Sequence, residues 1–475
     1  MTATAAYAAV AVVQRGLPLL LLPIYTRVLT PAEYADLGVL IAIWIGLTLI
    51  FSFGQEVSLF RNLFQTDRGT ENRRRLLETG ANLLLIVPLG VAAILVVPSV
   101  LTVHKWLMVD PLDLALVLLS AALFVSSTVL PFTVLRAEER LRDFIQLNVI
   151  LAVTTTALTL AFVVWLDWEV RGWFLATIFS NLATWIWTAR ILPWPWGIKL
   201  HGNDVRALLR IGLPLIPHHL SFWGLQLANR VILVGLVTQV QVALFTLAST
   251  LALPVTLLAG SMIYGVIPRY GDAIKDPSRR PALAGIVTVQ VSALASVGVA
   301  VALLAPAFCT LLFPPLYARA APLIPVIALG LAIGALYAVP LNAAALLAGR
   351  TTFAWVVTLL AASANLGVLY AAVPTYGLEA AAVAVCVGNA VLFLGTAVYS
   401  RLVARGALPY EWRRMSWSMA VLVGCYIGAV MTSGYDSPLD VVVRILWLAG
   451  AASVLVRLRI VPIGLAHRPV PQAPG

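Results

Sequence analysis

The sequence is dominated by apolar runs of about twenty residues, separated by short polar segments. Hydrophobic residues occupy 61% of the 475 positions, and charged residues occupy 11%. A soluble domain has about 45–50% apolar and about 25% charged residues, so this composition excludes soluble globular and disordered chains. About 20 consecutive apolar residues cross a bilayer as one helix. The sequence therefore predicts an all-α integral membrane protein.

About fourteen segments are long and apolar enough to be membrane-spanning helices. They cover residues 7–28, 37–60, 79–103, 112–135, 144–166, 172–191, 208–237, 241–267, 283–313, 321–348, 352–373, 377–400, 415–433 and 440–458.

The basic residues indicate how these helices are oriented. Of the 31 Lys and Arg residues, 24 lie in, or within three residues of, every second loop or the C-terminal tail. Cytoplasmic loops carry the excess of Lys and Arg, so we expect loop 61–78, the alternate loops after it and both termini in the cytoplasm. The net charge of +11 is then mainly an orientation signal, and we expect no nucleic-acid partner.

A short repeat predicts how the helices are grouped. Gly-Leu-Pro-Leu occurs at 16–19 and again at 212–215, and each copy opens a long apolar segment preceded by arginine. Because six predicted helices separate the two copies, both copies keep the same orientation. Two parallel bundles of this kind are a transporter architecture. We predict one six-helix bundle in 1–200, a second in 201–405, and two further helices with a cytoplasmic tail in 406–475.

Charged residues inside the predicted spans are the strongest functional signal. A charge in the hydrocarbon core costs about 2.5–3.5 kcal/mol, so it usually faces a cavity or a partner. Arg15 lies near the middle of the first span, and Arg230 lies deep in span 208–237. If that span is one helix, His219, Gln226 and Arg230 share a face. Arginine stays ionised and binds phosphate with two nitrogens.

These patterns give two sets of candidate site residues. The candidates for substrate binding are Arg15, Arg230, Gln14, Gln226, Asn229, His218, His219 and Arg27, and those for gating or ion coupling are Glu56, Arg61 and Arg269.

Simpler roles compete for several of these residues. Arg27 and Arg61 can extend to the membrane surface as lipid-facing arginines do. His218 and His219 can pack one helix against another, and Glu56 can be an ion-pair partner of Arg61.

Signals for enzyme chemistry are absent from the sequence. It has no phosphate-binding glycine loop and no His-Glu-x-x-His motif. The three cysteines lie in apolar segments without metal-ligand spacing, so we expect no metal and no cofactor. Asp110 and Asp113 are explained as residues at the start of a helix.

Several stretches resemble one family. Residues 22–40, LPIYTRVLTPAEYADLGVL, resemble the first-loop signature of Wzx-type polysaccharide flippases of the MOP exporter superfamily. Residues 228–270, 313–330 and 342–384 resemble later segments of the same family, so the resemblance runs from about residue 7 to 400. Two positions depart from its pattern: Ala35 follows Tyr34 where glycine is usual, and Asn229 precedes Arg230 where aspartate is usual.

The resemblance implies a substrate and a direction. The substrate would be an undecaprenyl-diphosphate-linked oligosaccharide, moved from the inner to the outer leaflet of a bacterial cytoplasmic membrane for surface polysaccharide biosynthesis. Membrane lipid and the polysaccharide polymerase machinery would be partners. Two other classes compete: a cation-coupled drug antiporter of the same superfamily, which usually needs carboxylates inside the membrane, and a membrane glycan polymerase or ligase. Glu56 is the only acidic residue that the predicted spans clearly contain, which favours the flippase.

Overall fold

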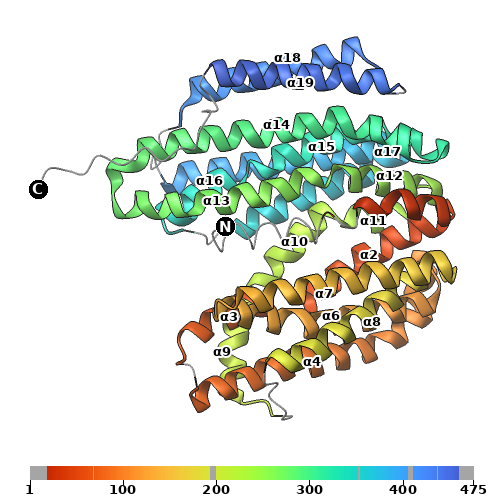
Figure 1. Cartoon of the computed structure of the whole chain (residues 1–475), viewed down its shortest axis with the longest axis vertical. Helices are drawn as coiled ribbons and strands as arrows, with labels where there is room; N and C mark the ends of the chain where they lie inside the picture. Colours follow the sequence, from red (N-terminus) through yellow and green to blue (C-terminus); the bar gives the residue numbers. More distant parts are fainter. Residues whose placement is uncertain are drawn as a thin grey trace, which may run out of the picture.

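The computed structural model describes residues 16, 19–67, 69–192, 199–350, 354–404, 410–435 and 437–458. In this part of the chain, helices joined by short connections make up the structure (Figure 1). Ten helical segments there are long and apolar enough to cross a membrane, and Leu19–Val28 is a shorter apolar helix. The chain is therefore an all-helical, multi-pass membrane protein, as its composition predicts.

The first group of helices comes from the N-terminal part of the chain. Polar caps mark the starts of two of its helices. Thr30 and Glu33 form a capping box at the helix that begins at Pro31. At the helix that begins at Pro111, the Asp110 carboxylate accepts the Leu112 N–H at 2.8 Å. The group comprises α2 (Pro31–Phe51), α3 (Gln55–Phe64), α4 (Glu71–Pro98), α5 (His104–Leu107), α6 (Pro111–Ala137), α7 (Leu141–Thr159) and α8 (Glu169–Ile191).

The second group follows in the sequence and lies beside the first (Figure 1). Its members are α10 (Ile216–Gln226), α11 (Ala228–Leu233), α12 (Gln239–Ala252), α13 (Pro254–Lys275), α14 (Arg280–Leu312), α15 (Leu323–Ala335), α16 (Ala338–Asn342) and α17 (Ala354–Ala404). Helix α17 bends sharply at Gly377, where φ is 62° and ψ is −144°, so it contains both the eleventh and twelfth predicted spans.

A helical hairpin forms the C-terminal part, with α18 (Trp412–Thr432) and α19 (Pro438–Arg457) packed on α14 (Figure 1). Arg444 fastens this hairpin. Its side chain is fully buried and donates to Leu303 O at 2.6 Å and to Ser433 Oγ at 2.9 Å. The guanidinium also lies 4.1 Å from the centre of the Tyr435 ring. Arg444 lies within the predicted span 440–458, and the structure buries its side chain.

The predicted helix 208–237 is wrong as a single helix. The structure divides this region into α9 (Gly202–Gly212), the short turn η3 (Leu213–Leu215), α10 and α11. The prolines at 214 and 217 lack the N–H that a continuous helix requires. Helix α9 begins inside the predicted loop and packs on α3 and α4 of the first group, whereas α10 packs on α17 of the second. The chain therefore passes from one group to the other at η3.

Predicted helix 37–60 is also interrupted. Helix α2 ends at Phe51 and α3 begins at Gln55, with Phe53 and Gly54 both at positive φ between them. This break lies directly against the break between α9 and α10. A Cβ on Gly212 would collide with the Phe53 carbonyl oxygen, and a Cβ on Gly54 would collide with the Gly212 carbonyl oxygen. Only glycine allows the two backbones to cross this closely.

We expect Gly212→Ala to destabilise the protein by about 1–3 kcal/mol, the usual cost of forcing atoms into a packed site. The measurement is the thermal midpoint of the purified protein in detergent. Gly260→Ala is the matched control, because a Cβ there meets nothing within 4 Å. Equal midpoints for the two variants would show that the backbone crossing is not tightly packed.

Candidate functional site

Arg230 lies on α11, between α2 of the first group and α12 of the second. Its side chain is 6% exposed, and its Nη2 donates to Thr250 Oγ1 at 3.1 Å. Its Nε has no hydrogen-bond partner in the structure. The guanidinium also interacts electrostatically with the Tyr34 phenol. The structure thus places a charged group at the junction of the two groups of helices.

Other polar atoms are buried without hydrogen-bond partners on Asn229, beside Arg230 in the chain, and on the elements that meet α2. Both side-chain polar atoms of Asn229, the Thr246 hydroxyl and the Tyr317 hydroxyl lack a hydrogen bond and are almost fully buried. An unsatisfied buried polar group costs about 1–3 kcal/mol, so an accumulation of them marks a place where water or a ligand group binds.

The polar face predicted for residues 219, 226 and 230 does not continue along one helix. Helix α10 ends at Gln226, and Leu227 leaves the helical conformation at φ −127° and ψ −26°. The Leu225 carbonyl at this break accepts the Asn365 side-chain N–H at 2.9 Å. Arg230 therefore lies on a separate short helix. Apart from the nearby prolines, no feature of the sequence indicated this break.

The polar side chains of α10 face α17. Gln226 Nε2 donates to Asn389 Oδ1 at 3.3 Å, and His218 Nδ1 lies 3.3 Å from the Thr358 hydroxyl. The His219 ring lies beside that of His218, with 5.9 Å between their centres. Gln226 and His218 thus hold α10 against its neighbour in this conformation, in agreement with the helix-packing alternative for the histidine pair.

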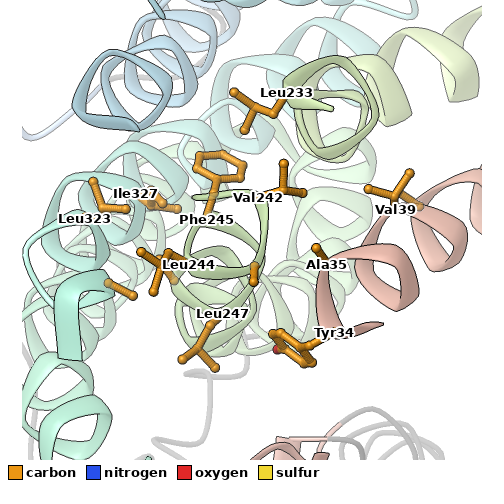
Figure 2. Packing of buried hydrophobic residues seen from close by; sticks show 14 of the residues in the cluster. Tyr34, Ala35, Val39, Leu233, Val242, Leu244, Phe245, Leu247, Leu323 and Ile327 are labelled. Atoms are coloured by element: carbon orange, nitrogen blue, oxygen red, sulfur yellow. The ribbon is translucent and has the colours of Figure 1, made fainter. Parts of the chain in front are cut away.

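The two groups of helices meet along α2. Figure 2 shows Tyr34, Ala35 and Val39 of α2 beside α12. The Tyr34 and Tyr317 rings meet edge to face with centres 5.8 Å apart, and a Cβ on Gly38 would lie 3.1 Å from the Thr246 Cβ. Towards the other end of α2, the Trp223 indole donates to the Ala42 carbonyl at 2.8 Å.

The remaining predicted site residues lie away from this junction or outside the described part of the chain. Arg27 is exposed and donates to the Leu312 carbonyl at 3.0 Å. Glu56 and Arg61 are exposed on α3, and no ion pair joins them in the structure. Arg269 is exposed, and its guanidinium lies 3.8 Å from the Asp272 carboxylate. Gln14 and Arg15 lie outside the residues that the structure describes.

The sequence reasoning missed one carboxylate within a helix, that of Asp36. Asp36 is half-buried in α2, close enough to Asp113 of α6 for their charges to interact. Arg171 pairs with Asp113 at 3.0 Å and with Asp110 at 2.6 Å. The statement that Glu56 is the only acidic residue clearly inside a span is therefore wrong. The hydropathy window began at residue 37, one position after Asp36.

A search for groups of three or more His, Cys, Asp or Glu side chains that could hold a metal ion finds none among the described residues. Cys309 and Cys425 are buried and Cys386 is half-buried, and all three are free thiols.

Comparison with known proteins identifies the family. Residues 2–273 match the model of the polysaccharide biosynthesis protein family. A comparison with curated protein sequences finds no match.

Solved structures share the fold. The lipid II flippase MurJ in an inward closed conformation has a TM-score of 0.68 and 11% identity, covering 96% of this chain and 99% of its own. An inward-facing multidrug resistance MATE family transporter of the MOP superfamily has a TM-score of 0.62 and 15% identity, covering 84% and 95%. A MOP superfamily transporter from Pyrococcus furiosus Vc1 has a TM-score of 0.52 and 17% identity, covering 85% and 96%.

These three structures are described as a flippase or as transporters, in agreement with the prediction that the chain is not an enzyme. The fold is that of the MOP superfamily, and the sequence match covers more than half of the chain. The chain therefore belongs to the polysaccharide biosynthesis protein family.

Proposed function

We propose that this protein flips a polyprenyl-diphosphate-linked oligosaccharide from the inner to the outer leaflet of the bacterial cytoplasmic membrane, for surface polysaccharide biosynthesis. Family membership supports a role in polysaccharide biosynthesis. The observation that carries the proposal is Arg230, a buried cation that has no carboxylate ion pair among the described residues. A diphosphate group supplies the negative charge that this site lacks.

The proposed architecture has fourteen membrane crossings in two six-helix bundles, followed by the α18–α19 hairpin, with both termini cytoplasmic. Helical segments occupy most of the described part of each predicted span, and ten of them are long and apolar enough to cross a membrane. The likeness to MurJ includes 96% of this chain, and the likeness to the MATE transporter includes 84%. The two covered shares differ by 12% of the 475 residues, which is about 57 residues. This number is close to the size of the α18–α19 hairpin with its connections.

The proposed substrate site combines Arg230 with Arg15. Each lies in the first predicted span of its bundle, at 15 and 230, so a pair of arginines would face the diphosphate from both bundles. Gln14, Asn229, Gln226, His218, His219 and Arg27 are proposed as further polar contacts, and Glu56, Arg61 and Arg269 as gating or coupling residues. A guanidinium binds phosphate oxygens through two parallel N–H donors, which suits a substrate that has to leave again as the bundles move.

Alternating access is the proposed mechanism. In this conformation the two groups contact each other along α2, through α10, α11 and α12. Opening the other face requires α2 to separate from these helices. The break at η3 gives the chain a place to bend while α9 stays with the first group.

A cation-coupled antiporter is the second candidate, and Asp36 favours it. A carboxylate half-buried in α2, near Asp113, is the kind of group that binds a proton or a metal cation inside the membrane. The same group can also couple a flippase to a cation gradient, so its presence alone does not separate the two functions.

Asp36→Asn should distinguish them. We expect this variant to reduce surface polysaccharide and to cause lipid-linked oligosaccharide to accumulate on the cytoplasmic side, because coupling is weakened while the diphosphate site remains. Dye efflux from the same cells should stay unchanged. The measurements are surface glycan staining, lipid-linked oligosaccharide quantification and dye retention. Loss of dye efflux with normal surface glycan would replace the flippase with the antiporter.

A further inference from the structure

Part of the junction between the two groups of helices lies at the N-terminal end of α2. Contacts come from the chain before α2, where Arg27 reaches Leu312 O, and from the first turns of α2, where Tyr34 meets Tyr317 and Gly38 meets Thr246. We call these contacts, together with Arg230, the α2 seam. The charge pattern of the loops predicts that this end faces the outside.

Three arginines are buried in the described part of the chain. Arg73 pairs with Glu138 at 2.9 Å, and the other two are bound in different ways. Arg444 makes three hydrogen bonds, to Leu303 O, Ser433 Oγ and Ser433 O, and contacts an aromatic ring. Arg230 makes one hydrogen bond, to a threonine hydroxyl, and its Nε has no partner. Arg444 therefore has the environment of a structural arginine, and Arg230 does not.

Further unsatisfied groups belong to the elements that form the seam. Thr246 on α12 and Tyr317 in the turn η5 (Pro315–Ala320) take part in the contacts with α2, yet their hydroxyls have no hydrogen bond. Asn229 precedes Arg230 on α11 and is also unpartnered. The closed seam thus buries a cation and several polar groups without satisfying them, which makes the closed state less stable than an apolar seam would be.

We propose that the α2 seam is an outer gate whose opening is driven by an anion of the phosphate class binding to Arg230. This inference rests on the proposed function and adds a regulatory role to the same arginine. With Arg230 only 6% exposed, a diphosphate cannot make a bidentate contact until α2 moves away from α12. A ligand that binds only the open state shifts the equilibrium towards that state. The substrate would thereby open the gate through which it leaves.

The proposal predicts an unusual effect of removing the charge. Arg230→Met keeps much of the side-chain length but removes the buried cation, so the closed seam should become more stable. A residue that merely holds the structure together would have the opposite effect, since its loss loosens the packing. Arg230→Lys keeps the charge and should preserve part of the response to anions.

The experiment measures how accessible the seam is from outside. The three native cysteines are replaced by alanine, and Thr246→Cys supplies a reporter opposite Gly38. A membrane-impermeant maleimide then labels right-side-out vesicles with no addition, with inorganic pyrophosphate, or with undecaprenyl diphosphate in the bilayer. A second reporter, Met108→Cys, lies at an exposed position that is not among the seam contacts and measures general access. Arg142→Met, at an exposed cation of α7, is the control for loss of charge.

We expect anion to speed labelling of the Thr246→Cys reporter, and Arg230→Met to slow it about tenfold and remove the response. The labelling rate of the Met108→Cys reporter should not change with anion or with Arg230→Met. Arg142→Met should leave the labelling rate of the Thr246→Cys reporter, and its response to anion, unchanged. Equal labelling rates with Arg230 and with Met at this position would overturn the gate, even if Arg230→Met still blocked export as the proposed function requires. A response to pyrophosphate but not to the lipid would support the gate and contradict the proposed substrate.

A cross-link tests the same seam without changing Arg230. A Cβ on Gly38 would lie 3.1 Å from the Thr246 Cβ, shorter than the roughly 3.5–4.5 Å between the Cβ atoms of a disulfide, so α2 and α12 need to separate by only a few tenths of an ångström to form the bond. The double variant Gly38→Cys/Thr246→Cys should lose transport on oxidation and regain it on reduction. Full transport by the oxidised protein would show that the seam need not open.

Discussion

Arg230→Ala should abolish surface polysaccharide while the protein accumulates in the membrane at its normal level. A hydrogen bond to a charged group contributes about 1.5–3 kcal/mol, so losing the contact with the diphosphate should slow transport by about 10- to 100-fold. Arg230→Lys should retain part of the activity, because it keeps the charge but not the bidentate geometry. Surface glycan staining and immunoblotting of membranes measure the two quantities.

Arg142→Ala is the matched control for this prediction, since Arg142 is exposed at the start of α7 and belongs to no proposed site. We expect it to export normally. Arg15→Ala should behave like Arg230→Ala, because the proposed site places one arginine on each bundle. Normal surface glycan in both alanine variants would contradict the diphosphate site, and a low protein level in either would assign that residue to stability instead.

Arg444→Ala should weaken the attachment of the α18–α19 hairpin to α14. The variant removes three hydrogen bonds from one guanidinium and a contact with the Tyr435 ring. It also leaves the Leu303 carbonyl and the Ser433 hydroxyl to find other partners. We expect a loss of about 3 kcal/mol in stability, measured as a lower thermal midpoint and as faster proteolysis of the C-terminal helices.

Arg457→Ala serves as the comparison, because Arg457 is exposed in the last turn of the same helix. It should cost less than about 0.5 kcal/mol, as surface substitutions usually do. If both variants unfold at the same temperature, the buried arginine does not secure the hairpin.

Hydropathy predicted where the helices lie, because long apolar runs have few alternatives to a membrane-spanning helix. It could not predict α9, whose buried Leu208 and exposed Arg206 and Arg210 lie on one short helix. A long window averages both faces of such a helix and reports a loop. The break at Leu227 was missed for a related reason: local conformation does not change the hydropathy of the segment.

The candidate site was predictable only in part. Arg230 stands out in the sequence as a charge within an apolar segment, and the structure buries it at the junction of the two groups. Its partners Thr250 and Tyr34 come from other parts of the chain, and no spacing rule connects them to Arg230. Arg230 and Arg444 are equally basic, and only their surroundings separate an unsatisfied cation from a satisfied one.

The crossing of Gly54 and Gly212 has a consequence for how this sequence can vary. Each backbone occupies the space that a side chain at the other position would need. A second substitution cannot compensate for the first, because any side chain adds atoms to the same contact. In a saturation library, both positions should therefore tolerate glycine alone. Every other residue at either position should be depleted, and no second substitution at the other position should restore the protein. Recombining gene segments between family members should succeed only when both parents carry glycine at these two places.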